Sequence, residues 1–434
     1  MKRLIYGQLV QWKNKPHRKP LVVKGARQVG KTWVIKEFGK AEFKSFMYIN
    51  CDSNERVSEL FEHDFDVKRI LRGLSAVSGV PVIPGDTLIF LDEIQEIPRA
   101  VQSLKYFCED APEYHVIAAG SLLGIHEHKD ISFPVGKIES VEMHPLSFSE
   151  FLMAAAGDSM YQLLMQSPIE ELAGLHSTLV EYLRQYYFAG GMPEAVQAFI
   201  DGRSPKEVRN IQKQILSDYN DDISKHAPYD QITRIDQVWN SIPAQLAREN
   251  RKFVYANIQK GARAREFEIA IQWLCNSGIV RKVNRVTKGC VPLKFYEDFS
   301  SFKLFFVDCG LMGALTEAPA AEILIGDSIF EEYKGAFTEN FVLQQLSSVL
   351  EDSLYYFSAD DSRQEIDFIF QNDTDIVPVE VQAKENLRAK AMRQYCSEHS
   401  GTTGIRISMS PYRKQDWMIN LPLYAAERIL DLRK

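Results

Sequence analysis

A glycine-rich octapeptide at residues 25–32 directly follows the apolar segment 21–23 and precedes a helix-compatible segment at 32–38. Its spacing, Gly-x-x-x-x-Gly-Lys-Thr, lets a backbone wrap around phosphate oxygens, with its N–H groups and a helix N-terminus facing the anion. Lys31 would then reach the β- and γ-phosphates, and the Thr32 hydroxyl would hold Mg²⁺. We therefore expect ATP and Mg²⁺ to bind here. The predicted nucleotide-binding residues are Gly25, Ala26, Arg27, Gln28, Val29, Gly30, Lys31 and Thr32.

Short apolar, β-branched runs alternate with helical patterns over the first 150 residues. Continuous apolar strands bounded by turn residues are typical of a parallel sheet that is buried on both faces. The sequence therefore predicts an α/β fold, a doubly wound parallel sheet around a P-loop. The expected strands are residues 21–23, 45–49, 87–91 and 115–119.

Acidic residues follow one of these strands. Asp92 and Glu93 end the apolar run at 88–91. A carboxylate at the end of a neighbouring strand can hold the Mg²⁺ that Thr32 also binds, so Asp92 is a predicted metal ligand. Glu93 could orient or deprotonate the attacking water, which makes it a candidate catalytic residue with Lys31. Ser121, after the next strand, either forms a turn or senses the γ-phosphate.

Four segments, residues 25–32, 91–95, 119–121 and 145–151, together resemble a family of prokaryotic AAA+ ATPases that carry a C-terminal domain of unknown function. The resemblance spans nearly the whole chain and implies the roles given above, with Ser121 near the first sensor position. Relatives often have arginine where this chain has Lys137. Lysine lacks the planar fork of arginine, so Lys137 is a poorer candidate for a residue acting on a neighbour's nucleotide. Arg99 and Arg184 are the other basic candidates.

Composition narrows the function classes. The formal charge is −7, so the chain as a whole is not a polycation that coats nucleic acid or anionic membrane. No apolar run reaches the roughly 18 residues of a membrane span, and no apolar core follows the basic N-terminal residues. The six cysteines are scattered, as in a reducing compartment. We therefore expect a cytoplasmic protein without membrane contact.

Residues 251–288 carry nine basic residues against two acidic ones. The expected order of helix, turn at Gly261, helix, turn at 276–278 and strand at 279–283 is that of a winged helix-turn-helix. Its second helix could lie in a DNA groove, and Arg263 and Arg265 are the residues to test. The alternative is a protein-contact module with a solvated basic face. Upstream, the glycine pair at 190–191 is either a plain interhelix turn or part of the nucleotide pocket.

Two expected strands near the C-terminus, residues 365–370 and 377–382, form a predicted hairpin. Period-2 alternation puts Asp367 and Glu380 on one face, where they could bind a divalent metal. This third of the chain resembles nucleases of the PD-(D/E)xK kind, which implies Glu339, Asp367 and Glu380 as the acids. Gln382 stands at the lysine position, and Lys384 lies two residues beyond. We therefore expect weak nuclease activity or none.

The predicted domains are residues 1–155, the P-loop AAA+ core; 156–240, a helical extension; 241–325, a winged helix; and 326–434, a restriction-endonuclease-like α/β domain. Two functions from different classes are compatible with this order. One is an ATPase that couples nucleotide state to DNA- or protein-binding domains. The other is a nucleotide-gated regulatory module with negligible turnover and a degenerate nuclease domain. Partners beyond ATP are DNA, another protein or further copies of the chain.

Overall fold

The computed structural model describes residues 1–120, 134–248, 251–325, 334–350, 353–359, 364–383, 389–399 and 401–433. It contains two compact units. The first comprises Met1–His144 with Asn276–Gly278, and the second comprises Pro145–Cys275 with Ile279–Lys434. The four-part division expected from the sequence stays a prediction. Across these ranges, no helix combines the length and hydropathy needed to cross a membrane.

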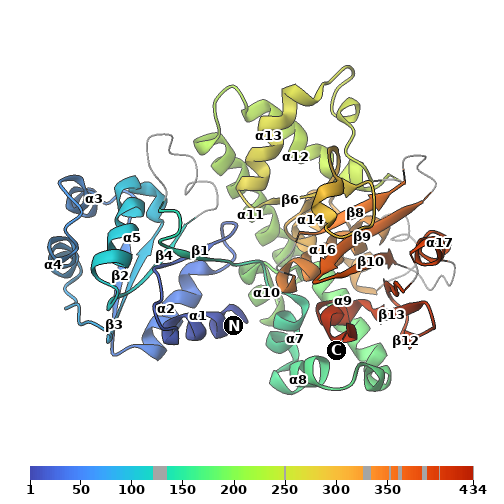
Figure 1. Cartoon of the computed structure of the whole chain (residues 1–434), viewed down its shortest axis with the longest axis horizontal. Helices are drawn as coiled ribbons and strands as arrows, with labels where there is room; N and C mark the ends of the chain where they lie inside the picture. Colours follow the sequence, from blue (N-terminus) through green and yellow to red (C-terminus); the bar gives the residue numbers. More distant parts are fainter. Residues whose placement is uncertain are drawn as a thin grey trace. The chain divides into compact units, whose positions relative to one another are not determined.

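The first unit is built on a five-stranded parallel sheet with strand order β2-β3-β4-β1-β5 (Figure 1). The four predicted strands and the α/β fold are confirmed. The fifth strand was not predicted, because its sequence Glu-Ser-Val-Glu has no apolar run and its side chains alternate between half-buried and exposed. The strands are β1 (Leu21–Lys24), β2 (Ser45–Asn50), β3 (Thr87–Asp92), β4 (His115–Ala119) and β5 (Glu139–Glu142).

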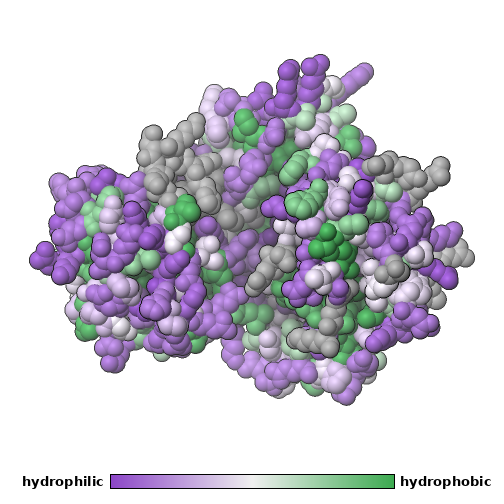
Figure 2. Space-filling model, viewed as in Figure 1, coloured by the Kyte–Doolittle hydropathy of each residue, from purple (hydrophilic) through white to green (hydrophobic). Residues whose placement is uncertain are grey.

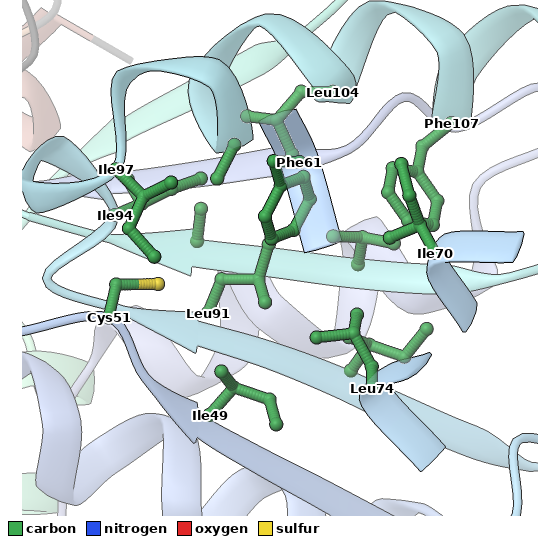
Figure 3. Packing of buried hydrophobic residues seen from close by; sticks show 14 of the residues in the cluster. Ile49, Cys51, Phe61, Ile70, Leu74, Leu91, Ile94, Ile97, Leu104 and Phe107 are labelled. Atoms are coloured by element: carbon green, nitrogen blue, oxygen red, sulfur yellow. The ribbon is translucent and has the colours of Figure 1, made fainter. Parts of the chain in front are cut away.

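The core of this unit lies where helices cover the sheet (Figure 3). Phe61 of α3, Ile70 of α4 and Phe107 of α5 pack with Ile49 and Leu91 of the strands. The central strands β1, β3 and β4 are buried over almost their whole length, as in a parallel sheet that helices cover on both faces. The helices are α1 (Ile5–Asn14), α2 (Lys31–Glu42), α3 (Glu55–Glu62), α4 (Val67–Ser78) and α5 (Pro98–Asp110), with the 3-10 turn η1 (Ile94–Glu96).

The second unit begins with a helical region and continues into a mixed α/β region (Figure 1). Figure 2 shows hydrophilic residues over most of the visible surface, with apolar residues between them. The helices are α7 (Phe148–Ala156), α8 (Asp158–Gln166), α9 (His176–Ala189), α10 (Pro193–Ile200), α11 (Pro205–His226), α12 (Ile232–Leu246), α13 (Ala264–Asn276), α14 (Cys309–Leu315), α15 (Ala320–Ile325), α16 (Lys334–Val349) and α17 (Lys390–Glu398), with 3-10 segments η2 (Ile169–Leu175), η3 (Tyr255–Asn257), η4 (Leu293–Tyr296) and η6 (Leu423–Arg433).

One eight-stranded sheet runs through the second unit, in the order β12-β13-β11-β10-β9-β8-β6-β7. The predicted hairpin is confirmed as β9 and β10, which pair antiparallel. The strand expected in the winged helix is β6, and it pairs with both β7 and β8. The antiparallel pair β6–β7 therefore belongs to the same sheet as β9 and β10, the strands predicted for a nuclease-like site. The strands are β6 (Val280–Val286), β7 (Glu297–Phe306), β8 (Tyr355–Ser358), β9 (Glu365–Asn372), β10 (Asp375–Gln382), β11 (Gly404–Ser408), β12 (Arg413–Lys414) and β13 (Met418–Pro422).

The N-terminus of α7 joins distant parts of the second unit. Ser147 and Glu150 form a capping box. The first helical N–H donates to Gln345 Oε1 of α16 at 2.7 Å. Ser149 donates its N–H and its hydroxyl to the two oxygens of Glu427, both at 2.7 Å. Buried side chains far along the chain thus satisfy the donors that a helix start leaves free.

The glycine pair at 190–191 is a tightly packed turn inside the second unit. Gly190 has φ +71°, and a Cβ at this position would collide with the Asp308 carboxylate. Gly191 donates its N–H to Asp308 Oδ2 at 2.6 Å and accepts from the Leu146 N–H at 2.7 Å. These contacts require a residue without a side chain, which accounts for both glycines structurally.

Candidate nucleotide-binding site

The glycine-rich loop lies between β1 and α2, at the carboxyl edge of the parallel sheet. Gly25 has φ +152°, and a Cβ there would collide with the Met143 carbonyl. Gly30 begins α2 with φ +95°, in the left-handed region that favours glycine. Gln28 also has a positive φ, +64°. The loop therefore has the close backbone approach and the helix N-terminus that bind phosphate.

Arg3 fixes this loop from the N-terminal segment. Its guanidinium is buried and donates to the Val29 carbonyl at 2.7 Å and to the His144 carbonyl at 2.6 Å. The sequence alone showed only a basic N-terminus, and no spacing rule connects residue 3 with the loop. The chain folding back over the sheet edge brings them together.

Lys31 is buried, at 7% exposure, on the first turn of α2. Its ammonium donates to the carbonyls of Gly25 and Ala26, at 2.9 and 2.8 Å. Burial lowers the pKa of this lysine to about 8, and the negative charges of Glu93 and Asp92 oppose that shift. The lysine is therefore held over the loop, and a bound anion would favour its charged form.

Thr32 and Asp92 meet, as the predicted metal site requires. The Thr32 hydroxyl donates to Asp92 Oδ2 at 2.8 Å, and the Tyr48 hydroxyl donates to the same oxygen at 3.2 Å. Burial raises the pKa of Asp92, the nearby charge of Glu93 adds to this, and the two hydroxyls oppose it. Tyr48 lies on β2, with Lys36 Nζ 3.6 Å from its ring centroid, and sequence reasoning missed it.

Glu93 lies directly beyond β3, with φ +50°. Gln95 Nε2 donates to its Oε2 at 2.6 Å. A left-handed backbone at a non-glycine residue is strained, and such strain often occurs at functional sites. Gln95 is buried and was not singled out from the sequence. Its position two residues after the catalytic candidate, on the turn η1, was the available signal.

The other residues predicted for the ATPase are Ser121, Lys137, Arg99 and Arg184. Ser121 lies outside the described residues. Lys137 pairs with Glu109, the charged atoms 2.7 Å apart. Arg99 donates to the Phe61 carbonyl at 2.6 Å and lies over the Phe65 ring, so packing within the first unit accounts for it. Arg184 is half-buried on α9 of the second unit.

The residues present fit ATP with Mg²⁺. Magnesium in nucleotide sites usually takes one or two protein oxygens and completes its shell with phosphates and water. Thr32 and Asp92 offer such a pair of oxygens. They lie beside the phosphate loop, whose conformation requires glycine at residue 25. Within the described ranges, no group of three or more His, Cys, Asp or Glu side chains could hold a metal by itself. A metal at this site would therefore depend on the nucleotide.

Two of the acids predicted for a nuclease-like site, Glu339 and Asp367, lie against cations in the second unit. Glu339 of α16 is buried, at 1% exposure, and forms an ion pair with Arg251 Nη1. The same guanidinium lies 3.5 Å from Asp367 Oδ1. Lys303 of β7, fully buried, lies 3.9 Å from Glu339 and 2.9 Å from Glu365. Arg251 and Lys303 were not among the predicted site residues, although a lysine inside the apolar strand 302–306 was a readable signal.

Glu380 and Gln382 extend this cluster along β10. Gln382 Nε2 donates to Glu380 Oε1 at 2.7 Å, and the N–H of Val381 donates to Asp367 Oδ2 at 2.8 Å. Burial raises the pKa of Glu380 to about 7, and the charge of Asp367 adds to the shift. The acids expected to share a metal are thus close together, with protein cations and an amide among them. Lys384 lies outside the described residues.

Three family models match the chain. Residues 17–152 match an AAA domain, residues 180–322 match the domain of unknown function DUF8612, and residues 334–424 match the domain of unknown function DUF4143. Comparison with curated proteins gave no match. The AAA part of the resemblance is therefore confirmed, whereas the two other matches describe no activity.

Two solved structures show weak likeness. The Walker-type ATPase PABY2304 of Pyrococcus abyssi is 14% identical with a TM-score of 0.45, over 73% of this chain and 95% of its own. The Aeropyrum pernix ORC1 protein in complex with DNA is 14% identical with a TM-score of 0.29, over 74% of this chain and 92% of its own. Neither carries weight at these TM-scores. The family match and the geometry of the loop show an AAA domain with a P-loop α/β fold, a domain type that binds ATP.

Proposed function

We propose that the AAA domain binds ATP with Mg²⁺ and hydrolyses it, and that nucleotide state is coupled to DNA or protein binding by the rest of the chain. The observation that carries the proposal is the 2.8 Å contact between Thr32 and Asp92 beside the phosphate loop. Lys31 binds phosphate oxygens, and Thr32 and Asp92 hold the metal. Bound Mg²⁺ supplies positive charge against the developing charge on phosphate. Glu93 accepts the proton of the attacking water.

ATP binding should depend on Lys31. The lysine offers a charge-assisted hydrogen bond to phosphate, which alanine cannot replace. Lys31→Ala should therefore weaken ATP affinity in calorimetry. The matched control is Lys40→Ala, on the same helix but exposed, which should bind like the wild type. Equal affinity in the Lys31 variant would refute the phosphate-loop assignment.

Hydrolysis should depend on Glu93. Glu93→Gln keeps the size of the side chain but cannot accept a proton, and general-base catalysis is typically worth about 10²–10⁴-fold. We expect unchanged ATP binding and a fall in turnover of that order. Glu96→Gln, exposed and three residues away, is the matched control. Wild-type turnover in Glu93→Gln would assign the base elsewhere.

The second candidate function is a nucleotide-gated regulator with negligible turnover. The hydrogen bond from Gln95 favours it, because this contact occupies one of the two oxygens with which Glu93 would orient the attacking water. Steady-state turnover of the wild-type chain, with and without DNA, separates the two functions. Turnover no faster than that of Glu93→Gln under both conditions would establish the regulator. Gel filtration with and without ATP and Mg²⁺ would show whether copies of the chain assemble.

A further inference from the structure

The basic residues of 251–288 divide into two sets by exposure. Arg251 pairs with Glu339, while Lys252 and Arg285 donate to Ser358. These three side chains therefore bind partners within the second unit. The half-buried set is Arg251, Lys252, Arg281 and Arg285. The exposed set is Lys260, Arg263, Arg265, Lys282 and Lys288.

Beyond its first turn, the helix expected to read DNA carries no exposed basic residue. In α13, Phe267, Ala270, Ile271 and other apolar residues are buried. The exposed positions beyond its first turn include Glu268, Ile269 and Gln272. An acid and an isoleucine are poor partners for a phosphate backbone. The exposed basic residues of the region therefore lie just before α13, in its first turn at Arg265, and on the hairpin β6–β7.

The connection of that hairpin also exposes aromatic rings. Phe295 on η4 is 82% exposed, and Phe299 at the start of β7 is 70% exposed. Exposed apolar side chains that form one patch commonly mark interaction sites, and these two rings are four residues apart in the sequence. Lys288 and Lys294 are exposed in the same segment. We define residues 288–299 as the hairpin tip.

The hairpin tip is a supported platform. Leu293 of η4 is buried in the core with Val286, Tyr355 and Ile366, and its N–H donates to Gln371 Oε1 at 3.2 Å. The pairing of β6 with β7 is irregular between Asp298 and Phe302, so Phe299 lies in a β-bulge. Bulges redirect side chains at sheet edges and functional sites. The backbone that carries the two phenylalanines is therefore anchored to the second unit at Leu293.

The two acidic residues of the hairpin tip, Glu297 and Asp298, contact partners within the second unit. Asn284 Nδ2 donates to Glu297 Oε1 at 2.6 Å. Arg285 Nη1 lies 3.4 Å from Asp298 Oδ2, and Ser300 donates its hydroxyl to Asp298 Oδ1 at 2.6 Å. The two lysines thus face solvent beside carboxylates that are half-buried and engaged. The exposed chemistry of the tip is aromatic and cationic.

We infer that the hairpin tip binds single-stranded nucleic acid, with Phe295 and Phe299 stacking on bases and Lys288 and Lys294 contacting phosphates. Exposed rings interleaved with cations are the chemistry of single-strand binding. Base faces are covered in a duplex, so the rings favour an unpaired strand. Lysine is depleted in protein–protein interfaces, which argues against a protein partner. This inference refines the DNA-coupling part of the proposed function and does not depend on ATP hydrolysis.

The test is binding of the full chain to labelled oligothymidylate, measured by fluorescence anisotropy, with the corresponding duplex as comparison. Phe295→Ala and Phe299→Ala should each weaken single-strand binding by about 5- to 150-fold. The control Tyr229→Ala, an exposed ring elsewhere in the second unit, should bind like the wild type. Lys288→Gln with Lys294→Gln should reduce the slope of log affinity against log salt by roughly 0.7 for each lost phosphate contact.

Four results would overturn the inference. They are no binding at low salt, equal affinity for duplex, single-strand binding indifferent to both phenylalanines, and phenylalanine-dependent binding to vesicles of phosphatidylcholine and phosphatidylserine without binding to the oligonucleotide. Strand binding is measured on the wild-type chain without nucleotide, and ATP binding is measured without the oligonucleotide. ATP binding without strand binding, or the reverse, would therefore separate failure of this inference from failure of the ATPase proposal.

Discussion

Replacing Arg251 with methionine should destabilise the second unit. Methionine keeps an aliphatic stem in the site but removes the cation that contacts Glu339, a carboxylate with 1% exposure. Lys303 would remain, at 3.9 Å from the other oxygen of Glu339 and already 2.9 Å from Glu365. The substitution therefore leaves a buried carboxylate with one shared cation.

The expected cost follows from this geometry. Removing one partner of a buried ion pair typically costs about 3–5 kcal/mol, because the other charge stays buried without compensation. The Arg251 side chain is 22% exposed, and Lys303 offers partial compensation. Both effects favour the lower end, a loss of about 3 kcal/mol.

Urea unfolding of the full chain, followed by a signal of the second unit, measures this loss. A loss of about 3 kcal/mol moves the midpoint by roughly 1–3 M for typical urea slopes. Arg263→Met, at an exposed position, is the control and should change little. The double variant Arg251→Met with Glu339→Gln should recover most of the stability, because the buried charge is gone. A loss below about 1 kcal/mol, or no recovery in the double variant, would refute this account of the cluster.

Three further predictions concern His115, Ser149 and DNA cleavage. Burial, and secondly the charge of Arg18, lowers the pKa of His115 to about 4. The neutral imidazole therefore contributes fully to the stability of the first unit above its usual pKa of about 6.5. This contribution, about 3 kcal/mol, is lost as the pH falls toward 4. His115→Phe should flatten that dependence of first-unit stability, and an unchanged acid profile would contradict the assignment. Ser149→Ala should cost about 2 kcal/mol in denaturant unfolding, because Glu427 loses a hydrogen bond in a fully buried site; a neutral effect would show that the contact does not stabilise the unit. With Mg²⁺ or Mn²⁺ we expect little cleavage of duplex or single-stranded DNA, and robust cleavage that Asp367→Ala abolishes would overturn this.

Local patterns were sufficient for much of the first unit. The strands β1 to β4, the phosphate loop and the acids after β3 follow from residues close together in sequence, because backbone pairing, glycine conformations and helix starts depend on near neighbours. Alternation also predicted the hairpin of β9 and β10. The edge strand β5 has no comparable pattern, because its residues are only partly buried.

Tertiary structure decided which side chains complete each site. Arg3 on the phosphate loop, Tyr48 on Asp92 and Arg251 on Glu339 are each separated from their partners by many residues. Such pairings depend on the order of strands in the sheet and on the path of the chain between them. The hydrophobic periodicity of the sequence specifies neither. The sequence by itself determined the phosphate-binding chemistry at the carboxyl edge of the first unit's sheet, because one short motif, residues 25–32, contains the residues concerned. Which cations neutralise buried acids was decided only in three dimensions, because a buried charge must find its partner wherever the fold brings one within a few ångströms.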